Sequence, residues 1–72
     1  MKLKELMHVL DGEQVIRVFA HTDNGPMSEV VYYGELDRIK WGFAKFEVKH
    51  VWVDDNEISI SLANTIDPDY FK

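Results

Sequence analysis

Residues 48–62 read VKHVWVDDNEISISL and carry the clearest hairpin pattern in the chain. Two runs rich in β-branched residues, 47–53 and 57–62, flank Asp54, Asp55 and Asn56. Asp and Asn tolerate the backbone conformations of tight turns, so the pattern predicts a β-hairpin with Asp55 and Asn56 as its central turn residues.

Counting outward from that turn pairs the two strands of the hairpin in antiparallel register. One face then carries two apolar pairs and one mixed pair: Val53 with Ile58, Val51 with Ile60, and Lys49 with Leu62. The opposite face carries the pairs Trp52 with Ser59 and His50 with Ser61. We expect the first face to belong to the core.

The chain before this hairpin predicts a helix and another hairpin. Apolar residues at positions 3, 6, 7 and 10 have the spacing of one helical face, and Gly12 follows where a helix can end in the left-handed conformation. Residues 15–21 and 28–34 are rich in β-branched and aromatic types and flank a turn at 22–26. A short amphipathic helix followed by a β-hairpin is therefore expected.

Between the hairpins, Leu36, Ile39, Phe43 and Phe46 form a helical stripe that Gly42 weakens, which predicts one or two helical turns and then a bend. Residues 63–72 show no periodicity, so we expect a frayed tail unless it docks through Ile66, Tyr70 and Phe71.

These elements predict one domain over residues 1–72, of the α+β class. Its mostly antiparallel four-stranded sheet consists of the two hairpins, with the N-terminal helix and the short helical segment against one face.

Composition limits the function further. The 72 residues include no cysteine, and eight Lys and Arg stand against thirteen Asp and Glu, giving a net charge of -5. Cysteine chemistry is excluded, and the negative charge opposes direct binding to nucleic acid or anionic membranes. Lys4, Glu5 and His8 interrupt the N-terminal apolar residues, so we expect no signal peptide and a cytoplasmic location.

No catalytic, metal or cofactor motif is evident. His50 opposite Ser61 offers a base beside a hydroxyl, but the G-x-S-x-G elbow is missing and a cross-strand polar pair explains both residues. His8, His21 and His50 lack the close spacing of a metal motif, and the glycines form no phosphate-binding loop. We therefore expect a protein that is not an enzyme and needs no cofactor.

The face opposite the predicted core is unusually aromatic. It would carry Val48, His50 and Trp52 from one strand, and Arg17, Phe19 and His21 from another. Trp, Phe and Arg are enriched at protein interfaces, so we expect Trp52, Phe19, Arg17 and His50 to bind a protein partner or a second copy of the chain. Alternatively, Tyr70 and Phe71 in the tail fold back and cover this face.

Three segments, MKLKELMHVLDGEQVIRVF, VVYYGELDRI and VKHVWVDDNEISISL, resemble a family of short uncharacterised proteins of prophages and conjugative elements of Gram-positive bacteria. The resemblance covers residues 1–62 and implies a cytoplasmic, non-enzymatic accessory protein of a mobile element.

Two further possibilities follow. Asp54, Asp55 and Glu57, with Asp67 and Asp69, could imitate phosphates and block a host nucleic-acid enzyme. A homodimer, formed through the aromatic face or an unpaired strand edge, would add burial that so small a chain otherwise lacks.

Overall fold

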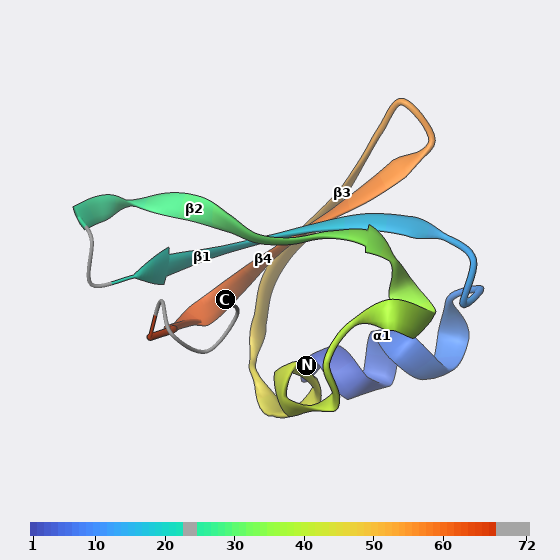
Figure 1. Cartoon of the computed structure of the whole chain (residues 1–72), viewed down its shortest axis with the longest axis horizontal. Coiled ribbons are helices and arrows are strands. Elements are labelled where there is room, and N and C mark those ends of the chain that lie inside the picture. The colour runs from blue at the N-terminus through green and yellow to red at the C-terminus, as the bar shows by residue number, and fades with distance from the viewer. Residues whose placement is uncertain (23–24, 68–72) are drawn as a thin grey trace.

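The computed structural model describes residues 1–22 and 25–67, and its α+β architecture confirms the expected fold class (Figure 1). A short helix precedes two β-hairpins, and two 3₁₀ helices connect the hairpins. The elements are α1 (Leu3–Val9), β1 (Val15–Thr22), β2 (Gly25–Glu35), η1 (Leu36–Arg38), η2 (Trp41–Lys45), β3 (Val48–Asp54) and β4 (Glu57–Thr65).

The four strands form one sheet in the order β2-β1-β4-β3. Both hairpins are antiparallel, and β1 pairs with β4 in parallel at the centre of the sheet. This central pair joins the two hairpins, placing Ile16 opposite Ile58 and Val18 opposite Ile60. The sheet is thus mostly antiparallel, with β2 and β3 as its edges.

One face of the sheet packs against α1 and the two 3₁₀ helices. Burial alternates along β1, so that Ile16, Val18 and Ala20 are inaccessible to solvent. The stripe predicted between the hairpins also packs inward. The buried cluster is Leu3, Ile16, Val18, Ala20, Val31, Leu36, Ile39, Phe43, Ile60, Leu62 and Ile66, with Phe46 partly buried against it.

Helix α1 ends differently from our expectation. Its C-cap is Leu10 in an extended conformation, and the following turn forms when Asp11 accepts hydrogen bonds from the backbone N–H groups of Glu13 and Gln14. Gly12 is therefore not a left-handed cap. Its small size matters elsewhere, because a Cβ atom on Gly12 would lie 3.2 Å from the Cβ of Asp37.

The second hairpin confirms the predicted turn. Asp55 and Asn56 have φ angles of 50° and 67°, the left-handed values that a tight two-residue turn needs. The register agrees for four predicted pairs, namely Val53 with Ile58, Trp52 with Ser59, Val51 with Ile60 and His50 with Ser61.

The fifth predicted pair is wrong, because the register shifts between Val48 and His50 and Leu62 faces Val48 instead of Lys49. One extra residue in a strand moves the residues beyond it to the other face. Val48 therefore packs against the core cluster and does not belong to the aromatic face.

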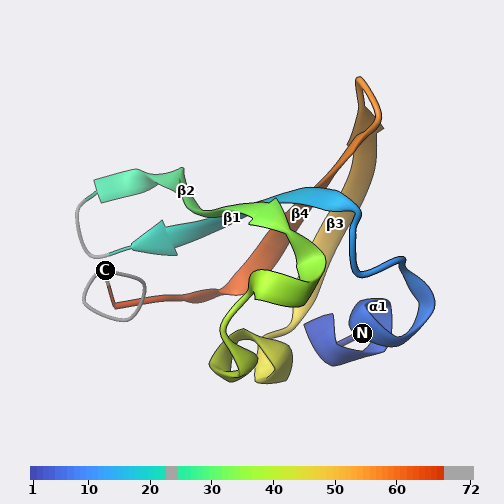
Figure 2. The ribbon, with the colours of Figure 1, turned by 45° about the vertical axis from the view of Figure 1, so that its right-hand side comes forward.

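The prediction that Val51 and Val53 belong to the core is also wrong. Their exposed fractions are 45% and 71%. In Figures 1 and 2, the tip of the β3–β4 hairpin points away from α1, so the helical layer does not cover it. Whether a residue at this end is buried depends on whether another element packs over it, and the sequence pattern of a hairpin does not predict that.

The first residues of the tail do not fray, because Ile66 docks as the alternative prediction required. Strand β4 continues to Thr65, and Ile66 is buried with its backbone N–H donating to the carbonyl of His21 at 2.8 Å. Tyr70 and Phe71 lie outside the described residues, as does the centre of the first hairpin's turn.

Candidate functional site: the outer face of the sheet

The outer face, opposite the buried cluster, centres on two stacked rings. Phe19 on β1 and Trp52 on β3 have ring centroids 5.7 Å apart and planes inclined by 18°. Strand β4 lies between them, and its residues on this face are Ser59 and Ser61. Small side chains on the middle strand leave room for the large rings of both neighbouring strands to meet above it.

Ser59 shows how closely these rings pack. It lies opposite Arg17 on β1 and Trp52 on β3, and only 3% of its surface is exposed. Trp52 itself remains 43% exposed. Arg17 and Trp52 therefore shield the middle strand at Ser59, while part of Trp52 remains exposed to solvent.

Arg17 interacts within the chain. Its Nη2 atom lies 3.3 Å from Oε1 of Glu57, and its guanidinium carbon lies 4.7 Å from the ring centroid of Tyr33. The Tyr33 hydroxyl donates a hydrogen bond to Oε2 of Glu57, and this bond raises the pKa of Tyr33 above its usual value. Arg17 thus borders the aromatic pair as part of a cluster with Tyr33 and Glu57.

The structure brings three predicted residues together and leaves one at the margin. Arg17, Phe19 and Trp52 share the centre of the face. His50 is exposed on the same side of β3, opposite Ser61. Within residues 1–22 and 25–67 it forms no ring contact and no ion pair.

Two further residues of β2, which were not predicted to lie here, belong to this surface. Tyr33 lies opposite Arg17 and Val30 opposite Phe19, and their exposed fractions are 54% and 46%. A register shift between the two pairs interrupts strict alternation along β2. The signal that could have identified Tyr33 is its pairing with Arg17, which requires the register of the first hairpin.

The possible catalytic pair has no supporting geometry. His50 and Ser61 are paired residues, but no hydrogen bond joins their side chains within residues 1–22 and 25–67. The same ranges contain no cluster of three or more His, Asp or Glu side chains placed to hold a metal ion.

The acidic candidates lie in different environments. Asp54 and Asp55 are exposed at the hairpin tip, whereas Glu57 is engaged by Arg17 and Tyr33. Asp67 lies beyond the end of β4, and Asp69 lies outside the described residues. Among the acidic candidates that the structure describes, Asp54, Asp55 and Asp67 are therefore the exposed ones.

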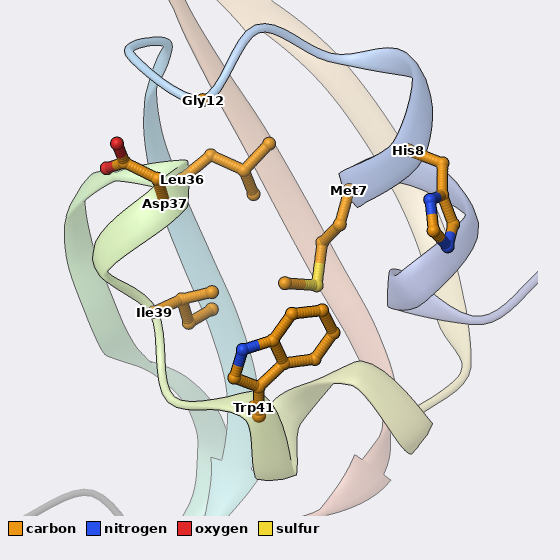
Figure 3. Close-up of a pocket in the computed structure, with 7 residues that line it drawn as sticks. All are labelled: Met7, His8, Gly12, Leu36, Asp37, Ile39 and Trp41. Atoms are coloured by element: carbon orange, nitrogen blue, oxygen red, sulfur yellow. The ribbon is translucent and has the colours of Figure 1, made fainter.

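A pocket of about 220 Å³ lies on the other side of the molecule, beside α1 and the two 3₁₀ helices (Figure 3). Met7 and the ring of Trp41 point toward one another, and Leu36 and Ile39 complete its apolar wall, while the carboxylate of Asp37 points away. Specific small-molecule sites combine apolar walls with convergent polar groups, and here the nearby carboxylate does not converge on the pocket.

No helix within the described ranges has the length and apolar character required to cross a lipid bilayer. Comparisons with protein-family models, curated proteins and solved structures give no significant match, so the functional argument rests on the geometry of the outer face.

Proposed function

We propose that this chain is a small non-catalytic protein-interaction module whose outer sheet face binds another protein through Trp52 and Phe19. The observation that carries the proposal is the stacked pair itself. Each ring restrains the other, so Trp52 loses less side-chain freedom when a partner packs on it than an isolated tryptophan would lose.

The surroundings of the pair support the same function. Tyr33 and Val30 extend the apolar surface, and the cluster of Arg17, Tyr33 and Glu57 supplies a polar border. An aromatic centre with a polar rim is the usual anatomy of a protein interface. Because Arg17 is paired with Glu57, the face offers a phosphate backbone little positive charge.

Affinity capture with matched variants tests this proposal. We expect wild-type protein and Trp41→Ala, which removes the exposed indole beside the pocket, to retain the same partner. Trp52→Ala and Phe19→Ala should each lose it while near-ultraviolet circular dichroism shows a folded protein. A partner retained equally by all four proteins would overturn the assignment.

The setting proposed for this module is that of an accessory protein of a prophage or other mobile element, supported by the resemblance over residues 1–62. The alternative function, acidic mimicry through Asp54 and Asp55, differs in its salt dependence. Binding through carboxylates to a basic partner weakens steeply with added salt, whereas binding through stacked rings changes little.

A further inference from the structure

Strand β3 is an edge of the sheet, and within residues 1–22 and 25–67 most of its outer side has no neighbouring strand. At its base, the backbone N–H of Val48 donates to the carbonyl of Met1 at 2.7 Å, and Lys2 forms a bridge with Glu47. The N-terminal segment therefore covers the edge up to Val48. From residue 49 to residue 54, the described part of the chain places no strand beside it.

The geometry of the turn determines which backbone groups face that open side. A two-residue turn makes Asp54 and Glu57 a hydrogen-bonded pair, so alternate residues of β3 direct their N–H and C=O groups away from β4. These residues are Val53 and Val51. An exposed edge of this kind is a template for another strand.

The sequence of the open edge is complementary to itself. Residues 49–55 read KHVWVDD, with basic or imidazole side chains first, apolar side chains in the middle and acidic side chains last. An antiparallel second copy runs in the opposite direction, so its acidic end meets the basic end of the first. We propose that β3 pairs with β3 of a second copy of this chain, around a twofold axis at Trp52.

The register follows from symmetry and charge. A twofold axis perpendicular to the sheet keeps each face on the same side, so the axis must pass beside a residue. With the axis at Trp52, Val51 meets the partner's Val53, His50 meets the partner's Asp54, and Lys49 approaches the partner's Asp55. Every apolar residue then faces an apolar one, and every acidic side chain approaches a basic or imidazole group.

Neighbouring registers lose this match. An axis at Val51 places Lys49 opposite the partner's Val53, and an axis at Val53 places Val51 beside the partner's Asp55. Only the axis at Trp52 satisfies both the apolar middle and the charged ends.

The same register satisfies the backbone. Val51 and Val53 carry the outward-facing groups, and each would exchange both hydrogen bonds with the partner's corresponding valine. The two Trp52 residues would form the closer, non-hydrogen-bonded pair, with Cα atoms about 4.5 Å apart. The stacked pairs of Phe19 and Trp52 would then meet as one aromatic row across a continuous sheet.

This inference goes beyond the proposed function and shares with it only Trp52. Sedimentation equilibrium at tens of micromolar protein tests it. We expect wild-type protein to have twice the monomer mass of 8.4 kDa. A mass of 8.4 kDa at every accessible concentration would overturn the proposal.

Two charge variants test the register. The first carries Lys49→Glu and His50→Glu, which makes both ends of the edge acidic. The second carries Asp54→Lys and Asp55→Asn, which removes the acidic end, and Asn suits the φ of 50° at position 55. Each variant alone should sediment as a monomer, and an equimolar mixture should regain the dimer, because opposite charges then meet at both ends.

Dimers formed equally well by either folded variant, or a monomeric mixture of two folded variants, would contradict the register. Lys49→Glu alone, at an exposed position, takes the place of the first variant if the double substitution does not fold. Phe19→Ala separates the two proposals, because Phe19 lies on β1, away from the edge. It should remain dimeric while losing the heterologous partner.

Discussion

Strands β1 and β3 have similar sequences and opposite surroundings. Both combine β-branched or aromatic residues with polar ones, as VIRVFAHT and VKHVWVD. In β1, every second residue is buried, whereas in β3 every residue after Val48 is exposed. Strand β1 lies between two strands and beneath the helical layer, and β3 lies at an edge beyond it. Alternation thus defines two faces of a strand, and neighbouring elements decide whether either face is buried.

The largest expected effect comes from the same substitution in each strand. Val18→Ala in β1 removes methyl groups from a fully buried site opposite Ile60, and should lower the free energy of unfolding by about 2 kcal/mol. Val53→Ala in β3 should change it by less than about 0.5 kcal/mol. Urea unfolding measures both, at a protein concentration low enough for the chain to be monomeric. Equal losses would mean that the end of β3 is covered in solution.

The two tryptophans give the next comparison. Trp52→Ala removes a stacked ring that shields Ser59, and should cost about 1.5 kcal/mol of stability. Trp41 is 75% exposed, so Trp41→Ala should cost less than about 0.5 kcal/mol. Thermal unfolding followed by far-ultraviolet circular dichroism would show the difference. A larger loss for Trp41→Ala would place more of the stability at the pocket than at the outer face.

The tip of the β3–β4 hairpin is not covered by the helical layer, so its stability depends on the turn more than the stability of β1 depends on any turn. Asn56 has a φ of 67°, so Asn56→Ala should cost about 1 kcal/mol, because a side chain other than Asn or Asp is strained there. Asn56→Gly should stay within about 0.5 kcal/mol of wild type, because glycine adopts positive φ freely. Denaturant midpoints measure both variants. A neutral Asn56→Ala would show that the turn is not held in this conformation.

The smallest effect concerns the two adjacent tyrosines. Burial raises the pKa of Tyr32, and the hydrogen bond to Glu57 raises the pKa of Tyr33 on the exposed face. The folded protein therefore holds both phenolic protons more tightly than the unfolded chain. Their contribution to stability is complete below pH 10.0 and is lost as the pH rises through the higher values of the folded state.

Unfolding free energies measured between about pH 8 and 11 test whether these two tyrosines stabilise the folded protein. Tyr33→Phe should reduce the alkaline loss of stability and leave the part that belongs to Tyr32. An identical pH dependence in Tyr33→Phe and wild type would contradict a stabilising bond between Tyr33 and Glu57.

Much of the fold could be predicted from local sequence. Turn residues and the flanking runs of β-branched and aromatic residues identified both hairpins, and the spacing of Leu36, Ile39 and Phe43 identified the buried stripe between them. The register of the second hairpin followed from Asp55 and Asn56 because a short turn determines which residues face each other.

The errors arose where distant segments meet. The register shift at Lys49 moved Val48 to the core, and the parallel pairing of β1 with β4 placed Ser59 opposite Arg17 and Ser61 opposite Phe19. Neither the register shift nor the parallel pairing can be recognised from the order of residues within one strand. The site prediction therefore identified the ring pair but missed Tyr33, whose place depends on the register across β1.

The parallel pairing at the centre of the sheet also affects how the chain can fold. Each hairpin closes locally, but the central contacts join distant positions, as when Ile16 of β1 lies opposite Ile58 of β4. Closing such a loop costs chain entropy before the core contacts that stabilise it have formed, and this slows folding. During synthesis, β1 and β2 emerge before β4, so the parallel pairing cannot form until β4 has been made. Until then β1 lacks its central neighbour, and the nascent hairpin is the state most exposed to mispairing.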